Sequence, residues 1–280
     1  MRIIATCAQC LFDKQRYLSK DENYLKEIKE IIENRKESDT APYLVYLFGK
    51  VYEKHFGKRA SYADIKKKYN NLVLSMEKDI RKLVEESDHP LEAALLYARV
   101  GNYIDFGAMN MVDDKTFLSL FFDIKVHDRE RNAIDSFFRQ VAEADKFLLI
   151  TDNCGEIVLD KIFVDQLKKS YPDLKISVLV RGEEVLNDAT MEDAEYVGID
   201  KYAEIITNGS SVAGTIYEML PDKARIAMDT ADVILAKGQG NYESLCGQGR
   251  HIFYSFLCKC DLFTNRFSVP KLTGMFVEEN

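Results

Sequence analysis

The sequence predicts an α/β fold in which a helical N-terminal region precedes a doubly wound, mostly parallel β-sheet. Up to about residue 125, apolar residues recur at every third or fourth position, as they do in amphipathic helices. From Phe147 onward, short runs of apolar and β-branched residues alternate with helical patterns. Strands that are separated by helices in this way indicate a parallel sheet that is covered on both faces.

Length and composition favour a globular protein of the cytoplasm. The 280 residues can form one large or two unequal domains, and 46% of them are hydrophobic. A formal net charge of −8 argues against a protein that binds the phosphate backbone of nucleic acids. The sequence contains neither an apolar run of roughly 20 residues, as a membrane span requires, nor a signal peptide. We therefore expect no nucleic-acid partner and no membrane partner.

The helical region is expected to form a domain over residues 1–128, and the α/β domain is expected over residues 129–280. A helix at about 129–144 leads from one to the other. Pro42 and Pro90 stand near the first turns of two helices, where proline is tolerated because its missing N–H group is not needed. The predicted helices of the N-terminal region cover residues 24–32, 44–51, 62–83 and 91–100.

Polar residues follow each of the first four predicted strands. Because the carboxyl ends of parallel strands lie along one edge of a sheet, we expect these residues to form one site. A fifth strand is predicted at 251–257. A helix at 212–220 is predicted after the third strand, which covers residues 204–207. Asp152-Asn153 follows the strand at 147–150, and residues 181–190 follow the strand at 174–180. Residues 208–211 follow the strand at 204–207, and residues 237–243 follow the strand at 231–236.

Three of these side chains suggest a metal site. The carboxylates of Asp152 and Asp188, together with the amide oxygen of Asn153, are oxygen ligands suited to Mg²⁺, Mn²⁺ or a similar divalent ion. The alternative is that Asp152 and Asn153 only cap the following helix, because both residue types are good N-caps.

Other residues of the same loops suit a phosphate group. Lys237 supplies a positive charge, and Gly238 exposes backbone N–H groups beside it. Gly209 and Ser210 precede a predicted helix, whose N-terminus would attract an anion. A metal beside a phosphate site favours hydrolysis by metal-activated water. No Walker A loop is present, and Gly238-Gln239-Gly240 is only half of a dinucleotide-binding motif.

Two further groups of residues are candidates. Asn102 and Asp105 follow a buried helix and could reach the site from the helical region, although a glycine C-cap followed by a turn is the alternative. Four cysteines could form a second metal site, with zinc as the expected ion, or a redox pair; buried free thiols are the alternative. These cysteines are Cys7, Cys10, Cys258 and Cys260.

The loops resemble the domain-of-unknown-function family number 89, also called the damage-control phosphatase or acidic-residue methyltransferase 1-like family. Residues 101–107 resemble a further block of this family, and the Cys7-x-x-Cys10 pair resembles its stand-alone prokaryotic branch. The three main blocks of the resemblance are residues 151–156, 186–190 with Asp193, and 232–243, which include Asn241 and Tyr242.

The resemblance implies a helical region on a three-layer α/β/α sandwich. It also implies a phosphatase that uses a divalent ion, such as Mg²⁺, Mn²⁺, Co²⁺ or Ni²⁺, and acts on sugar phosphates or on damaged or surplus phosphometabolites. Mapped onto this sequence, Asp152, Asn153 and Asp188 would bind the ion and Lys237 would lie by the phosphate. Gln239 departs from the Asp of the eukaryotic members, which leaves the substrate preference open.

Two other functions are compatible with these residues. A carboxyl methyltransferase activity has been attributed to the family, although the sequence has no methyl-donor signature. A protein that binds a phosphometabolite without turnover is the third possibility. The expected substrate-contacting residues are Asn102, Asp105, Gly209, Ser210, Gly238 and Asn241, with Glu156 and Glu243 as weaker candidates. The sequence predicts neither the particular substrate nor the oligomeric state.

Overall fold

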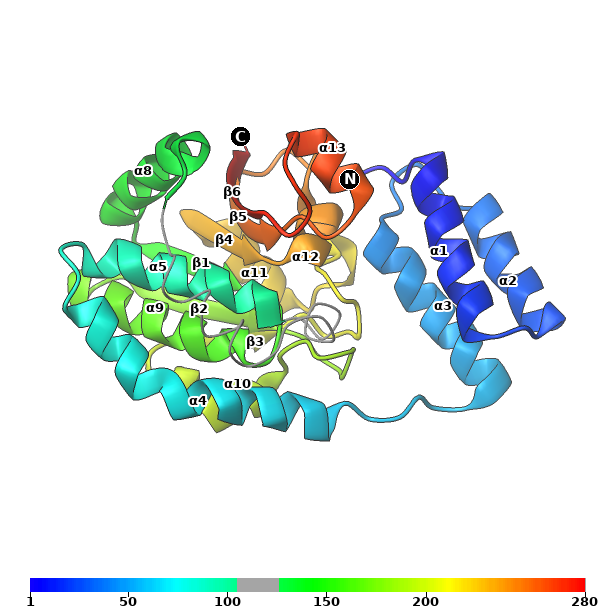
Figure 1. Ribbon diagram of the computed structural model, residues 1–280, viewed down its shortest axis with the longest axis horizontal. Coiled ribbons are helices and arrows are strands. Elements are labelled where there is room, and N and C mark those ends of the chain that lie inside the picture. Colours follow the sequence, from blue (N-terminus) through cyan, green and yellow to red (C-terminus); the bar gives the residue numbers. More distant parts are fainter. Residues whose placement is uncertain (105–125, 280) are drawn as a thin grey trace.

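The computed structural model describes residues 1–104 and 126–279, and its centre is a six-stranded sheet with the order β3-β2-β1-β4-β5-β6. The first five strands are parallel, and β6 is antiparallel to β5 (Figure 1). The predicted α/β class is confirmed, but β6 was not predicted because its apolar run is very short. The strands are β1 (Lys146–Ile150), β2 (Lys175–Val180), β3 (Glu204–Thr207), β4 (Val233–Lys237), β5 (Ile252–Leu257) and β6 (Gly274–Glu279).

The order of the strands reverses direction at β1. This strand pairs with β2 on one side and with β4 on the other, so that Ile150 lies opposite both Leu179 and Ala236. The loops that follow β1 and β4 therefore diverge from a common crevice at the carboxyl edge. In open parallel sheets this point of reversal is where ligands bind.

Helices cover both faces of the sheet, and the alternation of side chains along β1 shows how. Phe147 and Leu149 point into one hydrophobic cluster, whereas Leu148 and Ile150 point into the other. The first face carries α4 (Ala63–Glu85), α5 (Pro90–Val100), α8 (Asp128–Glu143), α9 (Glu156–Ser170) and α10 (Met191–Val197). The second carries α11 (Asp222–Thr230), α12 (Gln239–Leu245) and α13 (Asp261–Phe267).

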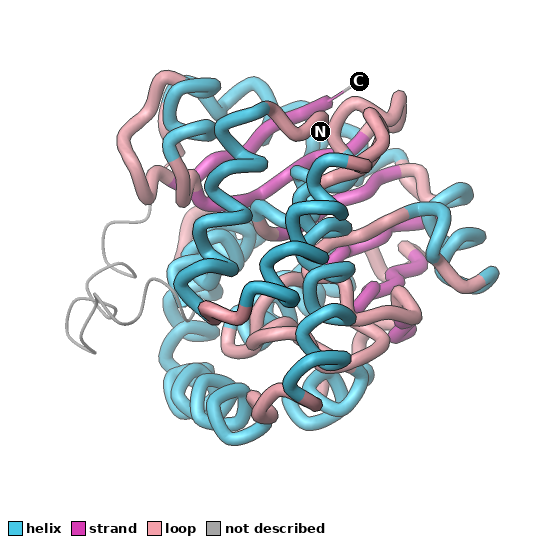
Figure 2. The backbone as a smooth tube through the Cα atoms, turned by 90° about the vertical axis from the view of Figure 1, so that its right-hand side faces the viewer, coloured by secondary structure: helices cyan, strands magenta, loops and turns pink. Residues whose placement is uncertain are grey.

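The first three helices form a unit with a hydrophobic core of its own, which we call the α1–α3 unit. It contains α1 (Ala5–Leu18), α2 (Glu22–Glu33) and α3 (Ala41–Phe56), and it stands beside the sandwich (Figures 1 and 2). Tyr24 and Phe48 are completely buried in its core. The helices α4 and α5 instead share the core of the sheet. Among the described residues, the hydrophobic clusters thus change between α3 and α4, whereas the domain boundary near residue 128 stays a prediction.

The predicted helix at 212–220 is wrong. Only a short 3₁₀ helix, η3 (Tyr217–Met219), forms there. A β-carbon at Gly214 would lie 2.9 Å from the backbone oxygen of Gly240, so this segment runs tightly against α12. Within residues 1–104 and 126–279, no helix is both long enough and apolar enough to span a bilayer.

Candidate active site at the carboxyl ends of the strands

Asp152 and Asn153 lie directly after β1, at the crevice where the strand order reverses. Both are buried, with 9% and 3% of their surfaces exposed. The helix α9 that follows has Gly155 as its N-cap and receives no hydrogen bond from a capping side chain. The alternative in which Asp152 and Asn153 serve as the helix cap is therefore wrong, and their side chains are available for another role.

The loop after β2 brings Asp188 to the same place. Asn153 and Asp188 form an isolated antiparallel bridge, which fixes the two loops side by side. The buried Arg181 joins the two carboxylates, since its Nε donates to Asp188 Oδ2 at 2.7 Å and its Nη2 lies 3.5 Å from Asp152 Oδ1. The sequence did not single out Arg181, although an arginine at the end of a parallel strand was the available signal.

Two amide side chains complete the cluster around Asp152. Asn102, in η1 (Gly101–Ile104), donates from Nδ2 to Asp152 Oδ2 and Glu156 Oε2, each at 3.2 Å. Asn153 Nδ2 donates to the same two oxygens at 2.8 and 3.1 Å. Asn102 thus faces the carboxyl edge as expected, whereas Asp105 lies outside the described residues.

Lys237 is close to this cluster but is already fully engaged. Its Nζ lies 2.7 Å from Glu156 Oε1, 2.7 Å from Asp160 Oδ1 and 3.0 Å from the backbone oxygen of Ala98. All three partners accept hydrogen bonds, and the lysine is completely buried. Lys237 therefore reaches the Asp152 cluster through Glu156, which belongs to both groups.

Asn241 connects the carboxyl ends of β1 and β4 through hydrogen bonds. Its Nδ2 donates to the backbone oxygens of Thr151 at 3.0 Å and Lys237 at 2.7 Å, so it ties the end of β1 to the end of β4. Its Oδ1 accepts from Thr215 Oγ1 at 2.9 Å and from Arg181 Nη1 at 3.3 Å. The sequence predicts that Asn241 contacts a substrate, but its polar atoms are used within the protein.

Burial and repulsion between carboxylates dominate the electrostatics. Burial, together with the charges of Asp188 and Glu156, raises the pKa of Asp152 to about 8. Burial likewise raises the pKa of Asp160 to about 7, against the opposing charge of Lys237. Burial alone would lower the pKa of Lys237, but its two carboxylate partners outweigh this and raise it. On the Asp152 side of the site, burial and the neighbouring carboxylates thus outweigh the positive charge of Arg181.

Comparisons with known proteins agree with the motifs at these loops. Residues 2–273 match the model of the damage-control phosphatase ARMT1-like domain. The chain belongs to this family. A protein of Archaeoglobus fulgidus named damage-control phosphatase is 31% identical over 93% of both chains. An uncharacterized protein of Methanocaldococcus jannaschii is 29% identical over 93% of this chain and 90% of its own.

A solved structure supports the fold of this ARMT1-like family member. The crystal structure of a family 89 protein from Pyrococcus horikoshii covers all of both chains with a TM-score of 0.79. The sequence identity in that comparison is 23%, so it supports the fold alone. It is consistent with the predicted sandwich and with the mostly parallel sheet.

The backbone groups that were expected to bind phosphate are occupied in this ARMT1-like chain. The N–H of Gly238 donates to the backbone oxygen of Ser255 at 2.9 Å, and the N–H of Ser210 donates to Asn208 Oδ1 at 3.0 Å. Gly209 and Ser210 do not stand at an α-helix N-terminus, because residues 212–220 form no α-helix. Gly238 instead leaves room for the Asp152 carboxylate, since a β-carbon at position 238 would lie 2.1 Å from Asp152 Oδ2.

We expect Gly238→Ala to displace the Asp152 carboxylate. Gly247 is the matched control because it has the same φ of +83°, but a β-carbon at Gly247 would meet no heavy atom within 4 Å. Gly238→Ala should cost about 1–3 kcal/mol of unfolding free energy beyond Gly247→Ala, and about a hundredfold in the activity proposed below. Equal losses in both variants would mean that only backbone strain matters at Gly238.

The donor set around Asp152 fits a divalent cation. The carboxylates of Asp152 and Asp188 are hard oxygen ligands, and the buried Oδ1 of Asn102 has no hydrogen-bond partner among the described residues. Within that part of the chain, no group of three or more His, Cys, Asp or Glu side chains could hold a metal ion. An ion at this place would therefore need amide oxygens, such as that of Asn153, as further ligands.

The cysteines do not form a metal site in the described ranges. All six are free thiols, and Cys258 is completely buried while Cys10 is exposed. Burial raises the pKa of Cys258 to about 11 and also raises that of Cys7, which makes both thiols poorer ligands. The geometry thus offers no support for zinc at Cys7, Cys10, Cys258 and Cys260.

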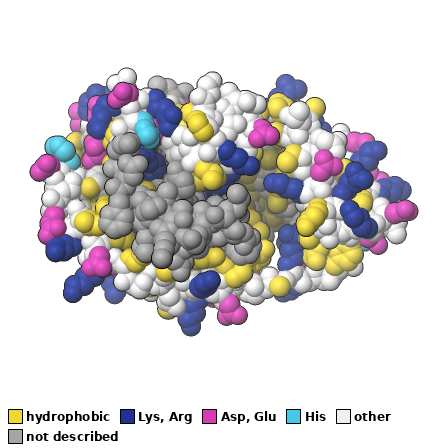
Figure 3. Space-filling view, in the orientation of Figure 1, with side chains coloured by type: hydrophobic (Ala, Val, Ile, Leu, Met, Phe, Trp, Pro, Cys, Tyr) yellow, Lys and Arg dark blue, Asp and Glu magenta, His cyan; other side chains and the backbone are white. Residues whose placement is uncertain are grey.

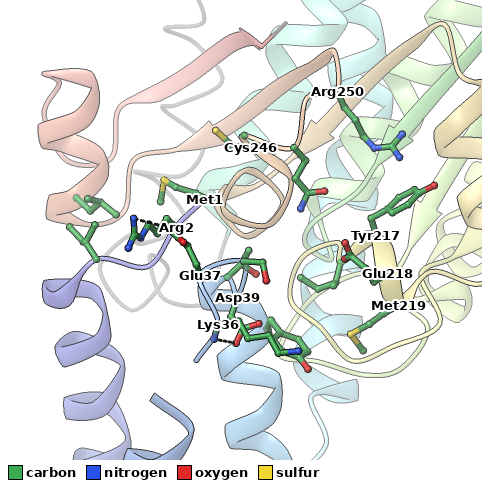
Figure 4. Close-up of a pocket in the computed structure, with 18 of the residues that line it drawn as sticks. Met1, Arg2, Lys36, Glu37, Asp39, Tyr217, Glu218, Met219, Cys246 and Arg250 are labelled. Carbon is green, nitrogen blue, oxygen red and sulfur yellow. Dashed lines mark hydrogen bonds and ion pairs between the residues drawn. The ribbon is translucent and has the colours of Figure 1, made fainter. Parts of the chain in front are cut away.

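A cavity of about 1050 Å³ lies elsewhere. It opens between the α1–α3 unit, η3, the segment after α12, and α13. Figure 4 shows Arg2 and Glu37 paired on one wall and Tyr217 and Arg250 on another. None of the predicted site residues lines this cavity.

Proposed function

We propose that this protein is a metal-dependent phosphatase that hydrolyses phosphate monoesters of small metabolites. The observation that carries the proposal is the convergence of Asp152 and Asp188 on a buried point at the reversal of strand order, where the pKa of Asp152 is raised to about 8. Buried carboxylates that repel one another favour a bound cation. The relative from Archaeoglobus fulgidus is named damage-control phosphatase, and so is a protein of Pyrococcus horikoshii that is 31% identical over 64% of this chain and 62% of its own; both names support the same activity.

In this mechanism the chain's own residues prepare the site. Asp152 and Asp188 would hold the ion, with Asn153 supplying its amide oxygen. A bound divalent ion would polarise the phosphate and lower the pKa of water near it. Arg181 holds Asp188 in position through its Nε, and its buried positive charge offsets part of the repulsion between the two carboxylates.

Lys237 acts on this site indirectly. It fixes Glu156, and Glu156 in turn accepts hydrogen bonds from the amides of Asn102 and Asn153. This arrangement orients both amides toward Asp152. We therefore assign Lys237 a positioning role, whereas Asp152, Asp188 and Asn153 would contact the ion. Arg181 is buried and bonded through all three side-chain nitrogens, so it would position the two carboxylates.

Chelation tests the proposal directly. We expect hydrolysis of p-nitrophenyl phosphate to fall at least about a hundredfold after treatment with a chelator, because the barrier would lose several kcal/mol of electrostatic stabilisation. Activity should return on addition of Mg²⁺, Mn²⁺, Co²⁺ or Ni²⁺. Activity that survives complete removal of metal, checked by elemental analysis, would refute the metal mechanism. Saturable binding of a phosphate ester without release of phosphate would indicate a binding protein instead.

A further inference from the structure

A second cavity lies between the α1–α3 unit and the loops at the carboxyl edge of the sheet. It measures about 400 Å³ and is lined by α3, by the segment that joins α3 to α4, and by the loops after β2 and β3. The residues that matter here are Lys50, Lys58, Arg59, Glu184, Leu186 and Ser211. Ser211 directly follows the Gly209-Ser210 pair that the sequence associated with an anion.

The cavity adjoins the carboxylate cluster through Leu186. This residue lines the cavity and stands two positions before Asp188, and two residues span at most about 7 Å. A hydrogen bond of 3.1 Å from the N–H of Asp188 to the backbone oxygen of Val185 holds the turn closed. Leu186 has a φ of +48° and is 42% exposed, an unusual conformation and location for leucine. Such strained residues are concentrated at ligand-binding sites.

The charge balance of the cavity favours an anion. Lys58 and Arg59 form no ion pair with any described residue, although Arg59 lies over the ring of Tyr52 at 4.5 Å. The carboxylate of Glu184 is engaged, since it accepts from Ser61 Oγ and from the N–H of Tyr62, each at 2.9 Å.

The pair formed by Lys50 and Glu53 changes the net positive charge of the cavity little. Glu53 faces Lys50 at 3.9 Å, which is a long and exposed contact. Figure 3 shows Lys and Arg side chains along the hollow between the α1–α3 unit and the rest of the molecule.

We propose that this cavity binds the part of the substrate that is not hydrolysed, and that it accepts a second anionic group on that part. The inference rests on the proposed phosphatase function, because it places the reacting phosphate at Asp152 and Asp188. Lys58 and Arg59 contact the second anion, which is a phosphate or a carboxylate. The substrates are therefore small metabolites with two anionic ends, one of which is removed.

Matched pairs of phosphate esters test the proposal. Glucose 1,6-bisphosphate is compared with glucose 1-phosphate, and 3-phosphoglycerate with glycerol 3-phosphate, so that one pair differs by a phosphate and the other by a carboxylate. We expect the doubly anionic member of at least one pair to have a kcat/KM about tenfold higher. The pair that responds identifies the anion. In K58A/R59A this preference should disappear through a higher KM for the doubly anionic ester, whereas kcat/KM for the singly anionic member of the same pair should change much less.

A control variant separates local contacts from overall charge. K26A/K29A removes the same charge from exposed positions of α2, neither of which lines the cavity. This control should keep the preference for the doubly anionic ester. In the unaltered protein, 0.5 M salt should reduce that preference, because Lys58 and Arg59 are exposed. A preference that is absent from the unaltered protein, or that persists in K58A/R59A, would overturn the inference.

Failure of the anion-site proposal can be distinguished from failure of the proposed phosphatase function. If p-nitrophenyl phosphate is hydrolysed but neither pair shows a preference, the cavity assignment fails and the phosphatase stands. If no ester is hydrolysed, the phosphatase fails, and calorimetric titration with glucose 1,6-bisphosphate decides the remaining question. Binding that K58A/R59A weakens about tenfold supports an anion site, whereas equal or undetectable binding in both proteins excludes it.

Discussion

Asp152→Asn should reduce phosphatase activity at least about a thousandfold, because the variant loses a charged oxygen ligand at the point where Asp152 and Asp188 converge. The substitution keeps the shape of the side chain, so the neighbouring amides need not move. Steady-state hydrolysis of p-nitrophenyl phosphate at saturating metal measures the effect. Asp165→Asn is the matched control: Asp165 is also buried, but it pairs with Arg81 on the outer side of α9. The control should retain its kcat.

The same variant should be more stable than the unaltered protein when metal is absent. The pKa of Asp152 is about 8 in the folded state and about 3.9 in the unfolded state, so the folded state holds its proton more tightly. The free energy of unfolding therefore falls as the pH rises from about 4 to about 8. Asp152→Asn removes this loss, and its advantage in thermal denaturation should be larger at pH 8 than at pH 5. A variant that is less stable at pH 8 would contradict the buried repulsion.

Lys237→Met should destabilise the protein by about 3–5 kcal/mol at pH 8, since it leaves two buried carboxylates without their cation. Glu156 and Asp160 each lie 2.7 Å from Lys237 Nζ and are completely buried. Chemical denaturation followed by circular dichroism measures the loss. The loss should be smaller at pH 5, because burial raises the pKa of Asp160 to about 7 and this carboxylate can then be neutralised by protonation.

A triple variant separates the positioning role of Lys237 from direct contact with phosphate. Combining Lys237→Met with Glu156→Gln and Asp160→Asn removes the unpaired charges and should recover much of the lost stability. If Lys237 acts by fixing Glu156, Glu156→Gln alone should lower kcat without changing the KM for p-nitrophenyl phosphate. A variant of Lys237 that keeps normal stability while KM rises would instead indicate that the lysine binds the substrate phosphate.

The sheet and the meeting of its loops were predictable because they depend on local patterns. Each buried parallel strand is a continuous apolar run, and the polar residues at its end are adjacent in the sequence. Once the strands are parallel, Asp152 and Asp188 must lie at the same edge. The predicted strand at 204–207 coincides with β3, and the other four predicted strands lie within a few residues of the observed ones.

The details of hydrogen bonding were not predictable, because they depend on contacts between distant segments. Lys237 was expected near a phosphate, but Glu156 and Asp160 stand one helical turn apart on α9 and pair with it on the same face of the sheet. The N–H of Gly238 is used by the neighbouring strand β5. Helical periodicity likewise shows which side of a helix is buried but not what buries it, so the separate core of the α1–α3 unit was missed.

The separate core of the α1–α3 unit places two groups of proposed site residues in different parts of the molecule. The residues assigned to chemistry belong to the sandwich, whereas Lys50, Lys58 and Arg59 belong to the α1–α3 unit or to the segment that follows it. Because Lys50, Lys58 and Arg59 lie outside the hydrophobic clusters that hold the strand ends, we expect substitutions at these residues to leave the proposed carboxylate site in place. Related proteins could thus acquire new substrates by altering this unit while conserving one reaction.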